Sequence, residues 1–177
     1  MSFIQTFQTI QNSKQFQNFK QQHPDAKLIA GFFILDFLSN DTKQTLDYKS
    51  EGKIFTFTLH NNNDITIKED KLLDIPSVPK LTPITLPSAL NVEIEDLKGT
   101  AGTQALDQGI SAKFHKIIAV LQNYQDNKIQ ELQQSKLIWN LTCMLDNLII
   151  LHVLINAQTG KILKFERRSM MDMVKKL

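Results

Sequence analysis

The chain has 177 residues, of which 42% are hydrophobic, and it carries a formal net charge of +2. A chain of this length and apolar content can form one domain, or two small ones, around a real hydrophobic core. Its basic residues are scattered, whereas a nucleic-acid-binding protein presents a concentrated basic face, so no nucleic-acid partner is expected.

The sequence contains a single cysteine, Cys143, which excludes an internal disulfide and a multi-cysteine zinc site. Residues 1–8 lack a basic region followed by an apolar run, so no signal peptide is predicted and a cytoplasmic location is expected. Residues 137–155 approach the ~20-residue length of a membrane span. Asp146 and His152 interrupt this stretch, and a charge near the centre of a bilayer is costly, so no membrane span is expected.

The first predicted element is a helix over residues 2–22, in which Ser2 and Ser13 are candidate N-caps. Its apolar residues fall on two faces, with Phe3, Phe7 and Ile10 on one and Phe16 and Phe19 on the other. The helix is therefore predicted either to kink near Asn12 or to be covered on two sides. Pro24 ends it, because the residue before a proline is pushed out of the α conformation.

Four antiparallel strands follow in the prediction, separated by turn residues, over residues 27–38, 43–49, 53–60 and 65–67. Residues 71–100 break this pattern with prolines at three- to four-residue spacing, at positions 76, 79, 83 and 87. Apolar residues are interleaved with the prolines. The segment is therefore interpreted as an extended connector that packs on the protein.

A second helix is predicted over residues 100–124, because Leu106, Ile110, Phe114 and Ile117 recur at helical spacing. Residues 128–134 are a candidate strand. Residues 137–165 then divide into a three-stranded meander at two turn signals, Asp146-Asn147 and Gln158-Thr159-Gly160.

The predicted fold class is α+β, with two helix-plus-antiparallel-sheet halves joined by a proline-rich connector. The corresponding domains are a helix and four-stranded sheet over residues 1–74, the connector over 75–99, and a helix with an antiparallel meander over 100–177. Each half is expected to wrap a curved sheet around its helix, so that each buries one face of the other.

Residues 151–163 read L-H-V-L-I-N-A-Q-T-G-K-I-L, an apolar strand, an Asn-small-x-Thr-Gly turn and a returning apolar strand. This segment resembles the closing hairpin of PepSY-type domains, and the predicted helix before it is similar to the PepSY arrangement, which has a cystatin-like shape. The resemblance covers roughly residues 103–166. Asn156 stands where that family usually has Asp. The resemblance implies a non-catalytic module that modulates proteases, and it carries no catalytic residues.

The candidate pocket or interaction residues are Trp139, Cys143, His152, His115, Arg167 and Arg168. A contact between Cys143 and His152 on adjacent strands would form a thiolate–imidazole nucleophile. A buried cysteine in a sheet interior is inert, and this is the preferred interpretation. No His or Cys spacing typical of a metal site occurs, so no metal, cofactor or enzymatic activity is expected.

Three classes of function stay open. The first is a non-catalytic binding or regulatory module with a protein partner, which is preferred because of the PepSY resemblance. The second is a small-molecule or lipid-binding protein, with an apolar ligand in a cavity between helix and sheet. The third is an enzyme that uses His152 or Cys143. Homodimerisation is also a hypothesis, because an uncovered sheet edge or the apolar connector invites pairing.

Overall fold

The computed structural model describes residues 2–39, 42–71, 81–86 and 90–169. Its helices are α1 (Phe3–Gln11), α2 (Lys14–Gln22) and α3 (Ile94–Asp107), with short 3₁₀ turns at Gln130–Leu132 and Asp146–Leu148. The first four strands are β1 (Lys27–Asp36), β2 (Thr42–Ser50), β3 (Lys53–Leu59) and β4 (Ile65–Lys71). The other four are β5 (Phe114–Tyr124), β6 (Lys136–Leu145), β7 (Ile149–Asn156) and β8 (Ile162–Ser169).

All eight strands belong to one antiparallel sheet in the order β4-β3-β2-β1-β5-β6-β7-β8. In its centre, β1 pairs with β5 from Ala30–Gln122 to Asp36–Lys116. The prediction of two separate helix-plus-sheet halves is therefore wrong. If each half formed its own sheet, β1 and β5 would be edge strands with unpaired backbone N–H and C=O groups. In the single sheet, these groups form hydrogen bonds between β1 and β5. The fold is dominated by this sheet, with three short helices.

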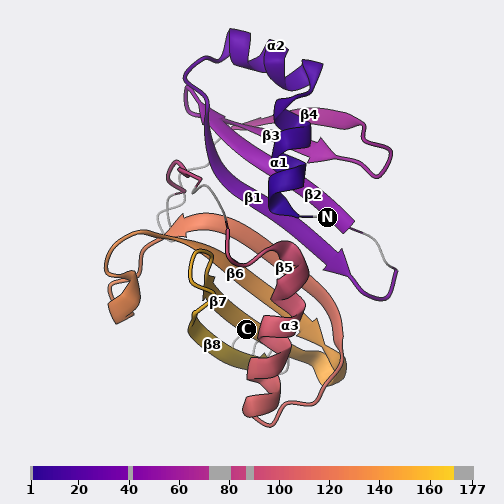
Figure 1. Ribbon diagram of the computed structural model, residues 1–177, viewed down its shortest axis with the longest axis vertical. Coiled ribbons are helices and arrows are strands. Elements are labelled where there is room, and N and C mark those ends of the chain that lie inside the picture. The colour runs from indigo at the N-terminus through magenta and orange to yellow at the C-terminus, as the bar shows by residue number, and fades with distance from the viewer. Residues whose placement is uncertain (1, 40–41, 72–80, 87–89, 170–177) are drawn as a thin grey trace.

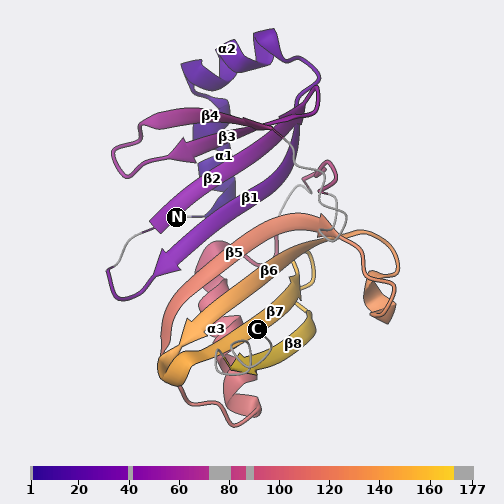
Figure 2. The same cartoon turned by 180° about the vertical axis from the view of Figure 1, so that it is seen from behind.

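The helices cover one face of the sheet. Figure 1 shows α1 and α3 in front of the strands, with α2 at the top of the view, and Figure 2 shows the opposite face, where the strands lie in front of α1 and α3. The hydrophobic core lies between the two layers, and its largest fully buried side chains include Trp139, Phe3 and Phe33. Their rings pack edge to face, with centroids 5.9–6.2 Å apart. We call the other side of the sheet the open face.

The predicted N-terminal helix is divided at the residues that the sequence indicated. Ser2 caps α1 by accepting a hydrogen bond from the Gln5 backbone N–H, and Ser13 caps α2 by accepting one from Phe16. The chain turns at Asn12, so the two apolar faces of residues 2–22 can both reach the sheet. The kink is thus confirmed.

The helix predicted over residues 100–124 is wrong in its C-terminal half. Helix α3 ends at Asp107, Gly109 adopts a positive φ of 70°, and residues 114–124 form β5. Along β5 the buried Ile117, Ala119 and Leu121 alternate with partly exposed neighbours. β-Branched residues fit this pleated surface better than a helix. Residues 128–134 are also not a strand, because they form a loop with one 3₁₀ turn.

The three-stranded meander of residues 137–165 is confirmed as β6, β7 and β8. Asn147 has a positive φ of 59° in the first turn and Gly160 one of 74° in the second. Asn156 Oδ1 accepts hydrogen bonds from the backbone N–H groups of Gln158 and Thr159, which closes the second turn.

Part of the connector can be followed. The backbone N–H of Ile84 donates to the Leu28 carbonyl at 2.8 Å, and Ile84 and Leu86 pack against the core. This confirms for residues 81–86 that the connector packs on the protein. The prolines at 76, 79 and 87 lie outside the described residues, and the domain boundaries near residues 74 and 99 stay a prediction.

Candidate functional site: the open face of the sheet

Trp139 and Cys143 lie on the helix-covered face of β6, and both are fully buried. The Trp139 indole Nε1 donates a hydrogen bond of 2.9 Å to the carbonyl of Val92. Burial raises the pKa of the Cys143 thiol to about 12, so the thiolate is disfavoured at neutral pH. Both side chains are therefore parts of the core.

His152 lies on the other side of the sheet from Cys143. In the β6–β7 register, Thr142 pairs with His152 and Cys143 pairs with Leu151. Because successive side chains of a strand point to opposite faces, the imidazole and the thiol are separated by the sheet. The structure does not bring the candidate nucleophile and base together.

His152 belongs to a polar cluster on the open face. Its Nε2 is 2.9 Å from Asn140 Oδ1, and its Nδ1 is 3.6 Å from Glu166 Oε2, which is too long for a hydrogen bond. Burial lowers the pKa of His152, and the nearby Lys164 ammonium lowers it further, while Glu166 acts in the opposite direction. The neutral imidazole is therefore favoured.

Glu166 is the centre of this cluster. Its carboxylate accepts from Lys164 Nζ and from Arg168 Nη2, each at 2.9 Å. The two cations, Lys164 first, lower the pKa of Glu166 to about 2. Arg168 is thus ion-paired within the cluster, and both Arg168 and the predicted site residue Arg167 are exposed.

His115 has a structural contact elsewhere. Its Nε2 lies in close contact with the carboxylate of Asp146, at the turn between β6 and β7. The Asp146 backbone N–H also donates to the carbonyl of Lys113 at 3.0 Å. His115 therefore helps to hold this turn against the start of β5.

The centre of the open face is apolar. Four partly exposed side chains of the two central strands face each other across the β1–β5 pairing, Phe32 opposite Val120 and Ile34 opposite Ile118. We call these four residues the open-face patch. None of them belongs to either hydrophobic core among the described residues. Next to the patch, Met144 pairs with Ile150, and Met144 is 37% exposed.

Polar side chains surround the open-face patch. Thr58 on β3 and Asn140 on β6 lie in the Phe32 row, and Thr45, between Phe32 and Thr58, is only 4% exposed. At one end, Lys116 Nζ lies 3.0 Å from Asp36. The Ser39 backbone N–H, followed by Lys116, holds the pKa of Asp36 well below its usual range. The patch is therefore an apolar centre with a polar rim.

One corner of the open face is covered by the chain itself. The loop between β5 and β6 brings Leu132 onto Ile138 and Leu154, and all three are fully buried. These residues form a small second core on the side of the sheet opposite the helices. The open-face patch lies beside this covered corner, on strands β1 and β5.

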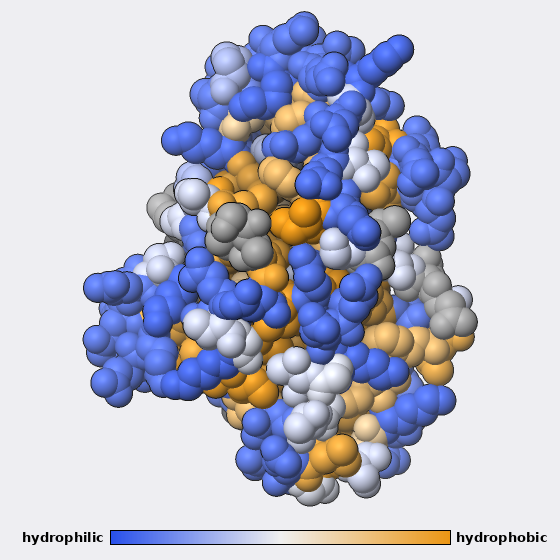
Figure 3. Space-filling view, viewed as in Figure 1, coloured by the Kyte–Doolittle hydropathy of each residue, from blue (hydrophilic) through white to orange (hydrophobic). Residues whose placement is uncertain are grey.

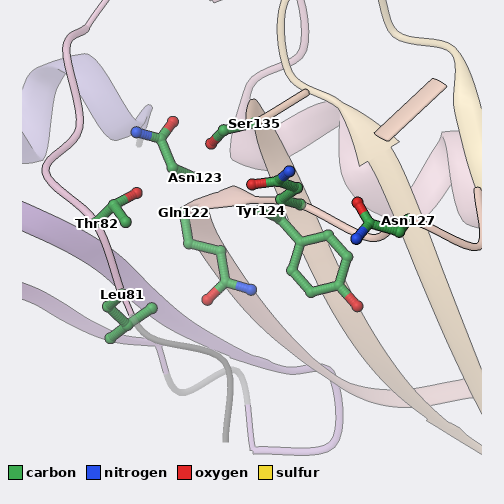
Figure 4. A pocket seen from close by; sticks show the side chains of 8 residues that line it. Leu81, Thr82, Gln122, Asn123, Tyr124, Asn127 and Ser135 are labelled. Atoms are coloured by element: carbon green, nitrogen blue, oxygen red, sulfur yellow. The ribbon is translucent and has the colours of Figure 1, made fainter. Parts of the chain in front are cut away.

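A polar pocket of about 500 Å³ lies at the end of β5. Figure 4 shows side chains from three segments around it, including Thr82, Asn123 and Ser135. Asn123 Nδ2 donates to the Pro83 carbonyl at 2.6 Å, and Gln125 Nε2 donates to the Gln133 carbonyl at 2.9 Å. These carboxamides tie the connector and the β5–β6 loop to β5, which is a structural role.

No local feature of the sequence marks the open-face patch. The predicted second helix includes residues 118 and 120, and residues 32 and 34 belong to a predicted apolar strand with no local signal for an exposed face. The alternation of Ile117, Ala119 and Leu121 with Ile118 and Val120 is the signal that identifies β5. Whether Ile118 and Val120 are exposed depends on which face of the sheet the helices cover.

Within the described ranges, no three His, Cys, Asp or Glu side chains are grouped in a way that could hold a metal ion. Among the helices of these ranges, none combines the length and the apolar character needed to cross a membrane. The cytoplasmic location inferred from the sequence stays a prediction.

Comparison with family models gave no match for this sequence, and comparison with curated proteins gave none either. Among solved structures, the chain is similar to a protein from Clostridium difficile 630 described as a "putative lipoprotein". The likeness has a TM-score of 0.52 at 15% sequence identity and covers 87% of this chain and 90% of the other. At this identity the likeness shows a shared fold only.

Proposed function

We propose that this chain is a non-catalytic binding module that docks a protein partner on the open-face patch. The observation that supports the proposal is the position of Phe32, Ile34, Ile118 and Val120. All four are partly exposed in the centre of an eight-stranded sheet whose other face is covered by the helices. Contiguous exposed apolar side chains with a polar rim are typical of interaction surfaces.

The surroundings of the patch fit a protein partner. Its four side chains come from two adjacent strands, and a second apolar pair, Met144 and Ile150, lies on β6 and β7 in the row of the rim residue Lys116. Charges of both signs lie around the patch, with Asp36 and Lys116 at one end of its strands and the Glu166 cluster to the side, on β8 in the row of Ile118. Such a rim can orient a partner, while the apolar centre contributes most of the affinity.

The resemblance of residues 151–163 to the PepSY closing hairpin makes a peptidase the first class of partner to test. In this proposal the chain modulates the peptidase by binding it and supplies no catalytic group. The buried Cys143 and the separate His152 are consistent with that role.

The proposal is tested by placing a photo-crosslinking amino acid at Ile118 in the full chain and irradiating it in its native cells. Leu106 is the matched control, since it is a 65% exposed apolar residue on α3. Discrete protein adducts from position 118 but not from 106 are expected. Identical adducts from both positions, or none from 118, would contradict docking on the open face, and a self-adduct would indicate a homodimer.

A second candidate function is small-molecule binding between helix and sheet. A pocket of about 410 Å³ lies between α3 and strands β1 and β2, with Phe33, Leu35 and Phe37 among its lining residues. Lys98 Nζ at its rim lies 4.0 Å from the centroid of the Phe37 ring. Apolar side chains reach the surface in the middle of this helix-covered side (Figure 3).

Native mass spectrometry of the purified protein, compared with its denatured mass, tests this second function. A small-molecule mass retained on the native protein would favour it. A native mass equal to the denatured mass would count against it and leave the protein-docking function ahead. The charge-state series also separates monomer from dimer.

A further inference from the structure

The polar pocket at the end of β5 lies near the point where the pairing of the two central strands ends. The last residue pair between β1 and β5 is Ala30 with Gln122. Beyond it, the connector contacts both strands. The Ile84 backbone N–H donates to the Leu28 carbonyl at 2.8 Å, and Asn123 Nδ2 donates to the carbonyl of the preceding connector residue at 2.6 Å. The pocket of about 500 Å³ is lined by the connector, the end of β5 and the loop that follows β5.

The loop side of the pocket is held in place by the protein itself. Gln125 Nε2 donates to the Gln133 carbonyl at 2.9 Å, and the Asp126 backbone N–H donates to the Leu132 carbonyl at 2.9 Å. Leu132 is fully buried in the small second core, and Tyr124 packs against the same core. A ligand that binds here therefore orders little of the chain, which reduces the entropic cost of binding.

The pocket wall is polar but uncharged. Seven of the eight described residues that line it carry a hydroxyl or a carboxamide, and Leu81 is the exception. Two of the carboxamides, those of Asn123 and Gln125, hold the connector and the loop. The other five side chains form no hydrogen bond with the described part of the chain, namely Thr82, Gln122, Tyr124, Asn127 and Ser135. Each of them can both donate and accept a hydrogen bond.

These side chains surround the edge of β5 (Figure 4). Gln122 and Tyr124 project to one side of the strand and Asn123 to the other, as successive residues of a strand do. Thr82 lies across from them on the connector, and Ser135 immediately precedes β6. A ring-shaped ligand between these segments can therefore meet polar groups on more than one of its edges.

The chemistry of the wall selects the class of ligand. A phosphate or a carboxylate would find no cation among the described residues that line the pocket, and an amine would find no carboxylate. An apolar ligand would cover hydroxyls and carboxamides without pairing them, which is unfavourable. A neutral ligand with several hydroxyl groups pairs with them, because each hydroxyl also donates and accepts. The pocket is open to solvent, so the remaining hydroxyls of such a ligand can stay in water.

We propose that the pocket at the end of β5 binds one neutral sugar unit, whose hydroxyl groups hydrogen-bond with Thr82, Gln122 and Ser135. The same chemistry describes a free sugar and the terminal unit of a glycan, and the test separates the two. The site lies beyond the open-face patch and does not rest on the docking function. Crosslinking from position 118 tests docking without any sugar, so either proposal can fail without the other.

The test is a titration of the full chain with glucose, galactose and mannose, followed by ¹H–¹⁵N spectra. Millimolar affinity is expected for at least one sugar, with shifts centred on residues 122–127 and 135, because solvent-exposed hydrogen bonds each contribute little. The uronate of that sugar should bind about fivefold more weakly, since its carboxylate cannot donate and finds no cation. Tighter binding of the methyl glycoside would indicate a glycan terminus, and tighter binding of the unmodified sugar would indicate a free sugar.

Two variants and a matched control locate the site. Thr82→Val and Gln122→Met remove a hydroxyl and a carboxamide with little change of shape, and each should weaken binding about fivefold. Thr58→Val removes a partly exposed hydroxyl on β3 and should leave the affinity unchanged. The spectra show whether each variant keeps the fold. A wild-type protein that binds none of the three sugars would overturn the proposal. Equal affinities in all three variants, or a uronate that binds as tightly as its neutral sugar, would overturn it as well.

Discussion

The indole of Trp139 joins the sheet to the segment that leads into α3, because its Nε1 donates to the Val92 carbonyl at 2.9 Å. Val92 immediately precedes Glu93, the N-cap of α3. The Glu93 carboxylate in turn accepts a hydrogen bond of 2.8 Å from the Phe3 backbone N–H at the start of α1. Trp139 thus lies where α1, α3 and the sheet meet.

Replacing Trp139 by Phe should destabilise the protein by about 2 to 4 kcal/mol. The change leaves the buried Val92 carbonyl without its donor and opens a cavity beside Phe3 and Phe33. Urea unfolding followed by far-UV circular dichroism measures the loss. Leu106→Ala, at an exposed position, is the control and should change the free energy of unfolding by less than about 0.5 kcal/mol.

Two glycine-to-alanine changes should have opposite signs. A Cβ at Gly31 would lie 2.7 Å from the Phe3 ring, whose side chain is fully buried, so Gly31→Ala should cost about 1 to 3 kcal/mol. A Cβ at Gly99 in α3 meets nothing within 4 Å, so Gly99→Ala should stabilise by about 0.5 to 1 kcal/mol. Thermal unfolding of both variants checks this, and equal signs would contradict the packing of Phe3 on β1.

The pKa of His152 should respond in opposite directions to its two charged neighbours. Lys164→Met removes a cation that lowers this pKa, so the pKa should rise. Glu166→Gln removes the anion that raises it, so the pKa should fall further below 6.5. NMR titration of the His152 ring protons measures both shifts. Shifts in the same direction would contradict the open-face arrangement of the cluster.

Acid should weaken the fold in two steps. The pKa of His152 is lowered on folding, so the unfolded chain binds this proton more readily and stability falls as the pH drops below about 6.5. The pKa of Glu166 is lowered to about 2, so its contribution is present above about pH 4.5 and lost as the pH falls toward 2. Solvent screening reduces the second step, because Glu166 is 37% exposed. The urea midpoint of unfolding, measured between pH 7.5 and pH 3, reports both losses of stability. The variant His152→Gln should remove only the loss that begins near pH 6.5.

Cys143 should be unreactive toward thiol reagents in the folded protein. It is fully buried, and its pKa is raised to about 12 by that burial. Ellman's reagent should label about one thiol per chain in urea and almost none in buffer. Rapid labelling of the native protein would reopen the hypothesis of a catalytic cysteine.

The elements that the sequence predicted correctly are those with a local chemical signal. Ser2 and Ser13 supply caps, and the turns at Asn147 and Gly160 need residues that tolerate positive φ. The helical prediction for β5 is wrong because Ile117 and Leu121, four residues apart, are compatible with both a helical and an alternating period. Phe114 is buried with them because the strand register shifts between Phe114 and Lys116. The pairing of β1 with β5 decided between the two periods, and this contact is not local.

The sequence by itself determined the meander, the four N-terminal strands and the core character of Cys143, and it offered the kink near Asn12 as one of two alternatives, because short-range periodicity and turn chemistry specify these features. Only the tertiary structure decided that the strands form one sheet, that His152 and Cys143 lie on opposite faces, and that Ile118 and Val120 reach solvent. A strand's pattern shows that it has two faces. Which face is buried depends on where distant helices pack.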